Sequence, residues 1–136
     1  MKRYTNPTLI YAVMAMIFGV FYREFTKIAD FTGKTVLSVM HTHYFVLGMI
    51  FFLLLLLLEK SFRFSTAKTG KILACYHVGL NISGGAFLVR GVLQVQETVL
   101  SSGLNAAISG IAGIGHILLG VSVILLLLQV KRAAEK

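Results

Sequence analysis

Residues 36–58 read VLSVMHTHYFVLGMIFFLLLLLL, and this stretch decides the fold. It contains no Asp, Glu, Lys or Arg, and it exceeds the roughly 20 apolar residues that an α-helix needs to cross a bilayer. Long apolar stretches follow at residues 72–95 and 105–130, and a shorter one precedes it at residues 7–22. We therefore predict four transmembrane helices over these ranges.

Composition supports a membrane protein. Hydrophobic residues make up 57% of the 136-residue chain and charged residues only 13%, whereas soluble domains have about 25% charged residues. Four apolar spans with short connections predict one all-α domain over residues 1–136, an integral membrane four-helix bundle with up-down-up-down topology. The lipid bilayer is thus the first partner that the sequence indicates.

The first apolar span is predicted to be a retained helix. Asn6 followed by Pro7 is a typical helix start, with an N-cap residue and then proline at the first helical position. The span ends in FYREF at residues 21–25, which has no small-x-small cleavage site of a signal peptide.

Net charge +8 at pH 7 is unevenly distributed around the predicted spans. The positive-inside rule then predicts cytoplasmic N- and C-termini in a plasma membrane, here a bacterial inner membrane. Since topology explains the excess charge, we expect no nucleic acid partner. The inner cations are Lys2, Arg3, Lys60, Arg63, Lys68, Lys71, Lys131, Arg132 and Lys136, and the outer ones are Arg23, Lys27, Lys34 and Arg90.

Histidines lie inside the predicted spans, where histidine tends to mark a functional site that faces the bundle interior. Depth follows from the rise of a helix, counted from the inner charged ends. His43 lies roughly 24 Å above Glu59, and His116 lies roughly 22 Å above Lys131. These two histidines therefore share one level near the outer side, with His41 slightly higher.

Residues two apart on a helix point to different faces, so His41 and His43 cannot both serve one site. Depth favours His43 as the partner of His116, whereas the small residues on the face of His41 favour His41. The sequence leaves this choice open. The face of His116 includes Gly113 and Gly120, which permit close helix approach or leave room for a flat ligand.

Bis-histidine ligation of haem b is the chemistry that this arrangement suggests first. The axial ligands would be His116 and either His43 or His41. Arg23 and Arg90, near the outer side, would pair with the haem propionates. The leading prediction is a small integral membrane b-type haem protein that acts in electron transfer, haem sensing or haem handling.

Two other functions stay open. One is a Cu or Zn binding or transport protein that uses His41 or His43, His116 and a third ligand. The other is a non-catalytic membrane subunit or assembly factor whose histidines form interhelical hydrogen bonds. A homo-oligomer is compatible with each of these functions.

His77 and Asn81 predict a second polar site. His77 lies roughly 9 Å above Lys71, which puts it in a different layer from the other histidines. With Asn81 four residues later, it either joins helices or contributes to a quinone-like or proton site. A redox partner or a quinone is the partner besides the bilayer that the sequence suggests.

Familiar enzyme motifs are absent from the sequence. It has no nucleotide-binding loop, no H-E-x-x-H and no C-x-x-C. A non-enzymatic role is therefore favoured over an enzyme.

Residues 19–60, GVFYREFTKIADFTGKTVLSVMHTHYFVLGMIFFLLLLLLEK, resemble a family of small bacterial four-helix membrane proteins without an assigned function. Residues 41–52, HTHYFVLGMIFF, are more distantly similar to the second helix of haem–copper oxidase and nitric oxide reductase catalytic subunits. In those enzymes a histidine of this helix ligates the low-spin haem b. The resemblance implies that His41 or His43 is an axial haem ligand, without implying oxygen or NO reduction.

Overall fold

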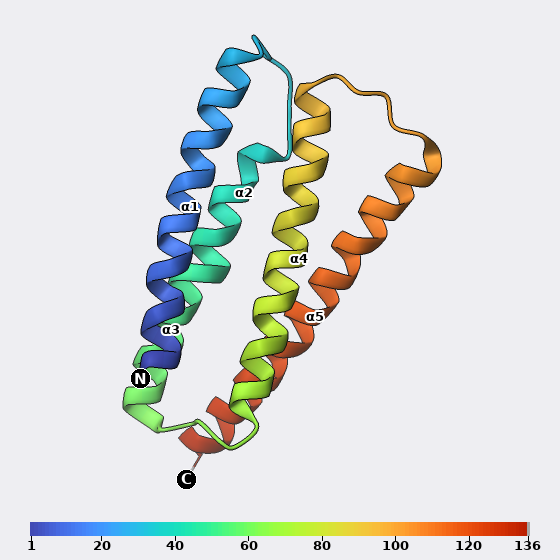
Figure 1. Cartoon of the computed structure of the whole chain (residues 1–136). Helices are drawn as coiled ribbons and strands as arrows, with labels where there is room; N and C mark the ends of the chain where they lie inside the picture. Colours follow the sequence, from blue (N-terminus) through green and yellow to red (C-terminus); the bar gives the residue numbers. More distant parts are fainter. Residues whose placement is uncertain (136) are drawn as a thin grey trace.

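The computed structural model describes residues 1–135, so Lys136, counted above among the inner cations, lies outside the described residues. Within residues 1–135 the chain forms four long helical rods that run alternately up and down (Figure 1). All four are long and apolar enough to cross a membrane. The predicted all-α four-helix membrane bundle is confirmed.

The rods extend further than the predicted spans. Helices continue into their polar ends because their backbone hydrogen bonds stay internal, whereas the predicted spans followed the apolar residues alone. The rods are α1 (Lys2–Ile28); α2 (Leu37–His43), the π-helical segment η1 (Tyr44–Ile50) and α3 (Phe51–Phe62), which form one continuous rod; α4 (Thr69–Val95); and α5 (Ser102–Ala134).

The predicted helix start at Asn6 and Pro7 is wrong. The first helix begins at Lys2, and Pro7 lies inside it. Tyr4 gives the reason, because its side chain is fully buried and its hydroxyl is hydrogen-bonded to Ser65 Oγ at 2.7 Å. Pro7 is the sixth residue of this helix, so it lacks the N–H that would bond to the carbonyl of Arg3, and the helix continues through it.

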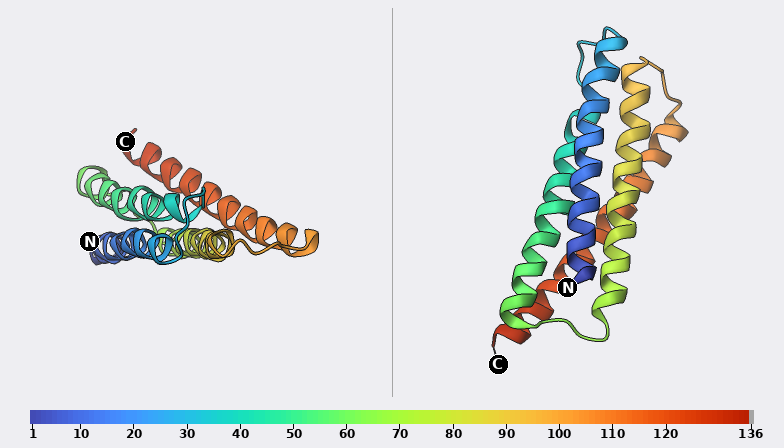
Figure 2. Two further views of the ribbon diagram at one scale, coloured as in Figure 1. Left: turned by 90° about the horizontal axis from the view of Figure 1, so that it is seen from above. Right: turned by 60° about the vertical axis from the view of Figure 1, so that its left-hand side comes forward.

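The four rods pack as two pairs. The first helix runs along α2, η1 and α3, and α4 runs along α5. Contacts of α2 and η1 with α4, and of α3 with α5, join the pairs. Seen from above, α5 crosses the bundle obliquely (Figure 2). As a result, α1 and α4 meet mainly through side chains.

Glycines set the close crossing of α4 and α5. A Cβ at Gly115 would lie 2.5 Å from Ser83 Oγ and 2.9 Å from the carbonyl oxygen of Gly79. A Cβ at Gly79 would lie 2.8 Å from the Gly115 carbonyl oxygen. Small residues are what permit such close helix packing in a membrane.

The segment η1 departs from α-helical geometry. Turns of this kind bond i to i+5 and leave the ordinary hydrogen-bond pattern. The Tyr76 hydroxyl donates a hydrogen bond of 2.5 Å to the Leu47 carbonyl of this segment. Gly48 lies against Tyr11, since a Cβ there would lie 2.5 Å from Tyr11 Cβ. The π-helical segment is therefore anchored to both α4 and α1.

Candidate functional site

The two histidines of α2 point to different sides of the helix. His41 lies over Gly19 of α1, where a Cβ would lie 3.7 Å from the imidazole Cγ. His43 points toward α4 and α5, with its ring centroid 5.1 Å from that of Phe87 and 5.8 Å from that of His116. The structure therefore brings His43 to His116 and directs His41 toward α1.

Hydrogen bonding sets the tautomer of a neutral His116 ring. Its Nδ1 lies 2.7 Å from the Ala112 carbonyl oxygen. A carbonyl oxygen only accepts, so Nδ1 carries the proton and Nε2 keeps its lone pair. On the other ring, His43 Nε2 is buried and has no hydrogen-bond partner among residues 1–135. Such unpartnered buried nitrogens are uncommon in folded proteins.

Phe87 packs against this histidine pair and also lines a small cavity. The Phe87 ring lies edge-on to both imidazoles, with its centroid 5.9 Å from that of His116. A cavity of ≈ 270 Å³ has Phe87, Arg90 and Ala112 in its wall, and neither His43 nor His116 lines it. His116 itself is exposed on the outside of the bundle. The pair is thus closed on the α4 side and open toward lipid.

Arg90 and Arg23 have different surroundings. Arg90 Nη2 donates to Asn105 Oδ1 at 2.9 Å and to Ser109 Oγ at 2.8 Å, which ties α4 to α5 beside the cavity. Arg23 is exposed on α1, where its nearest ionic contact is Glu24 at 3.7 Å. Of the two arginines expected to pair with propionates, only Arg90 borders this cavity.

Gly113 and Gly120 do not contact another helix. A Cβ at either position would have no atom within 4 Å, so both glycines lie on the outside of the bundle. The close approach expected on the face of His116 takes place instead at Gly115, which is buried against α4. Gly115 was not among the residues predicted for this site, because it lies between the positions assigned to that face.

A three-ligand metal site is not found within residues 1–135. No group of three or more His, Cys, Asp or Glu side chains in that part of the chain could hold a metal ion. The third ligand that Cu or Zn would need beside His43 and His116 is therefore missing from the described residues.

The second predicted polar site centres on Tyr11. Its hydroxyl lies 2.6 Å from His77 Nδ1 and accepts a hydrogen bond of 3.1 Å from Asn81 Nδ2. The same Nδ2 donates to the His77 carbonyl at 2.8 Å, and Tyr44 donates to Asn81 Oδ1 at 3.3 Å. His77 and Asn81 thus belong to one network that joins α1, η1 and α4.

This network sets the tautomer of His77. The His77 carbonyl only accepts, which fixes the amide nitrogen of Asn81 on that side. Of the two described hydrogen-bond partners of the Tyr11 hydroxyl, Asn81 Nδ2 can only donate, so the arrangement that satisfies the Tyr11 proton has it donated to His77 Nδ1. The imidazole then carries its proton on Nε2, so this nitrogen is a donor and is not free to ligate a metal.

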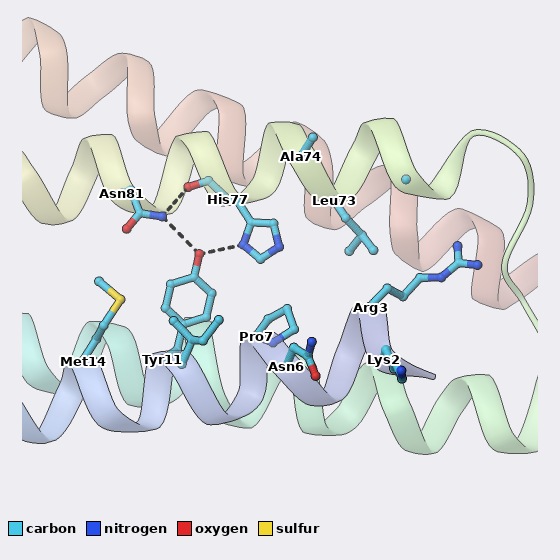
Figure 3. A pocket seen from close by; sticks show the side chains of 12 residues that line it. Lys2, Arg3, Asn6, Pro7, Tyr11, Met14, Leu73, Ala74, His77 and Asn81 are labelled. Atoms are coloured by element: carbon cyan, nitrogen blue, oxygen red, sulfur yellow. Dashed lines mark hydrogen bonds between the residues drawn. The ribbon is translucent and has the colours of Figure 1, made fainter.

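Aromatic packing fixes the direction of the His77 ring. Phe52 stacks on it with a centroid separation of 4.8 Å and an interplanar angle of 7°. The Tyr11 ring lies 5.6 Å away on the same network. Figure 3 shows the second ring nitrogen of His77 pointing away from Tyr11, on the side of Leu73.

His77 and Tyr11 line a cavity that is larger than the one next to Phe87. It has a volume of ≈ 790 Å³ and lies between α1 and α4 (Figure 3). Neither this cavity nor the role of Tyr11 was predicted from the sequence. A tyrosine inside an apolar span was the available signal, because a buried phenol usually finds a hydrogen-bond partner. The lining comprises Lys2, Arg3, Asn6, Pro7, Ile10, Tyr11, Met14, Gly70, Leu73, Ala74, His77 and Asn81.

Comparison with known proteins identifies the family of this chain but assigns no activity to it. The family described as "Protein of unknown function (DUF2871)" matches residues 1–133. No curated protein and no solved structure matches the chain. The match agrees with the expected likeness to a family without an assigned function. It lends no support to the distant likeness to haem–copper oxidases and nitric oxide reductases.

Proposed function

We propose that this chain, which belongs to the DUF2871 family of proteins of unknown function, is an integral membrane protein that binds haem b. His43 and His116 would be the axial ligands, one from each pair of helical rods. The protein would act in electron transfer, haem sensing or haem handling. Bound haem would supply one-electron redox chemistry, and the chain's own residues would hold it within the bilayer.

The observation that carries this proposal is the meeting of two imidazoles without a third ligand. Their ring centroids lie 5.8 Å apart. His116 keeps the Nε2 lone pair, and His43 Nε2 has no partner among the described residues. Structural zinc takes four protein ligands, whereas haem iron already has the four porphyrin nitrogens and needs only axial ones. Two histidines therefore suit haem better than a bare ion.

The surroundings define how haem would fit. Ligand pockets commonly measure roughly 300–1,000 Å³, and the cavity next to Phe87, which neither histidine lines, measures ≈ 270 Å³. This cavity alone would not hold haem, so the exposed side of His116 would have to supply the remaining room. Phe87 would have to turn away from the two imidazoles. Arg90, in the wall of the cavity, would then be placed to pair with a propionate.

We also propose the plasma membrane of a bacterium as the location, with both termini cytoplasmic. Figure 1 shows both termini and the α3–α4 loop at the same end of the bundle. Basic residues gather at that end, as the positive-inside rule describes for the cytoplasmic side. Those in the described residues are Lys2, Arg3, Lys60, Arg63, Lys68, Lys71, Lys131 and Arg132.

A second candidate function is a non-catalytic membrane subunit or assembly factor. The edge-on packing of Phe87 against His43 and His116 supports it, because this aromatic cluster already joins α2, α4 and α5 without a ligand. In that case the histidines would stabilise helix packing only.

A visible absorption spectrum tests the first proposal. Protein purified from haem-replete cells is expected to show a Soret band, or to acquire one when hemin is added. His43→Ala and His116→Ala should each abolish or shift the band. His41→Ala should keep it, because His41 faces α1.

The absence of a Soret band with and without hemin would contradict haem binding and favour the second candidate. Loss of the band in His41→Ala, with retention in His43→Ala, would refute the ligand assignment. Stoichiometric Cu or Zn in the purified protein would contradict haem binding and indicate a metal-ion binding protein instead.

A further inference from the structure

The groove between α1 and α4 has the dimensions of a ligand site and lies away from the histidine pair. Its volume of ≈ 790 Å³ falls within the roughly 300–1,000 Å³ common for ligand pockets. Ile10 on its wall is 55% exposed, so the groove opens toward the bilayer. Met14 and Leu73 add apolar surface along its length. The occupant therefore needs an apolar body that enters from the membrane.

The deep end of the groove presents a single oriented donor. Stacking on Phe52 and the hydrogen bond with Tyr11 hold the His77 ring, whose proton is on Nε2. Figure 3 shows this nitrogen on the groove side, toward Leu73. An N–H group in apolar surroundings needs an acceptor. The occupant should therefore have a carbonyl or similar oxygen at this depth.

The inner mouth of the groove is basic. Lys2 and Arg3 line it, beside the amide of Asn6, and no acidic side chain is among the described lining residues. Arg3 lies eight residues before Tyr11, or roughly 12 Å along the helix. The long stems of lysine and arginine allow their charged groups to reach part of this distance. The occupant should therefore have an anion some ångströms nearer the membrane surface than its carbonyl.

We propose that this groove binds an anionic glycerophospholipid. Its phosphate would pair with Lys2 and Arg3, and one ester carbonyl, which lies deeper than the phosphate in such a lipid, would accept from His77 Nε2–H. An acyl chain would follow the apolar wall into the bilayer. A neutral quinone would accept a hydrogen bond from His77 Nε2–H but would leave Lys2 and Arg3 without an anionic partner. The charge complementarity of the mouth therefore favours the phospholipid.

A bound lipid would complete the packing between α1 and α4. These helices meet mainly through the Tyr11 network, while each packs closely on another rod. A lipid wedged beside that network would bridge the two pairs of rods. The proposal is independent of haem, because its residues lie on a different side of the bundle from His43 and His116.

Native mass spectrometry of the full chain in a mild detergent tests the proposal. Three lipids with identical chains serve as probes: phosphatidylglycerol, its diether analogue without ester carbonyls, and zwitterionic phosphatidylcholine. The wild-type protein should bind phosphatidylglycerol about tenfold more tightly than phosphatidylcholine. It should prefer the ester form over the diether form about fivefold, as expected for one hydrogen bond.

Two variants separate the two contacts. The double variant Lys2→Gln/Arg3→Gln should lose the preference for the anionic headgroup and keep the preference for the ester. His77→Phe keeps an aromatic ring for stacking on Phe52, and should lose the ester preference while it keeps the headgroup preference. Thermal unfolding of each variant checks that the bundle is intact.

Lys60→Gln/Arg63→Gln is the matched control, since it removes two inner cations that do not line the groove. Equal loss of phosphatidylglycerol binding in this control and in Lys2→Gln/Arg3→Gln would overturn the proposal. So would equal binding of all three lipids to the wild-type protein. A naphthoquinone that binds more tightly than phosphatidylglycerol and is lost in His77→Phe would make the groove a quinone site instead.

Discussion

Tyr11→Phe removes one oxygen atom from the centre of the network between α1 and α4. That oxygen is 2.6 Å from His77 Nδ1 and 3.1 Å from Asn81 Nδ2. Hydrogen bonds between membrane helices contribute about 0.6 kcal/mol each on average, and up to about 1.7 kcal/mol. The two bonds, with His77 Nδ1 left without a donor, give an expected loss of about 1–2 kcal/mol in the free energy of unfolding. The phenyl ring itself is kept, so its packing against Phe52 should not change.

The assay is SDS-induced unfolding in mixed micelles, followed by pulse proteolysis. Tyr22→Phe on the same helix is the control, because its hydroxyl has no hydrogen bond to any described residue, and a change within about 0.5 kcal/mol is expected. A double-mutant cycle of Tyr11→Phe with Asn81→Ala should give a coupling of at least about 0.5 kcal/mol. Equal unfolding free energies for Tyr11→Phe and Tyr22→Phe would refute the network as a source of stability.

Two further predictions concern helix packing and use the same assay. Gly115→Ala should destabilise the bundle by about 1–3 kcal/mol, because the new methyl meets the Gly79 backbone at 2.9 Å. Gly113→Ala, in open space, should be neutral or slightly stabilising, and equal effects of the two substitutions would contradict the assigned crossing. Tyr76→Phe should cost about 1 kcal/mol, since it leaves the Leu47 carbonyl without its side-chain donor. No loss of stability in Tyr76→Phe would show that this bond does not anchor the π-helical segment.

Vertical positions in the bundle followed from the sequence because a helix has a fixed rise. Counting residues from the inner charged ends put His43 and His116 at one level, and their rings indeed meet at 5.8 Å. Rotation about the helix axis was harder to predict. Depth favoured His43 and the small-residue face favoured His41, and the contacts with Gly19 and Phe87 show that the two rings face different helices.

Helix rotation is hard to predict in a membrane because lipid is as apolar as the bundle interior. Hydrophobic periodicity tells the buried side of a soluble helix from its exposed side, and this contrast fades in a membrane. Gly113 and Gly120 therefore looked like interior positions and lie outside, whereas Gly79 and Gly115 make the crossing. Which glycines face a neighbour depends on how the rods are rotated.

The hydrogen-bond network around Tyr11 could not be predicted from the sequence for a related reason. His77 and Asn81 were recognisable as a pair because they lie four residues apart on one helix. Their partner Tyr11 lies 66 residues before His77, on a rod whose rotation no local pattern determines. The cavity beside it follows from that same rotation and from the buried Tyr4, which draws Lys2 and Arg3 into the helix.

The segment η1 changes the direction in which side chains before and after it project from the rod. His43 and Phe52 are nine residues apart, which in an uninterrupted α-helix is about 900°, or two and a half turns, and would put them on opposite faces. Both nevertheless reach α4, His43 at Phe87 and Phe52 at Tyr76. Wider π-turns rotate the chain less per residue. Because of this one segment, His43 near the outer end of the rod and Phe52 nearer its inner end both pack against α4.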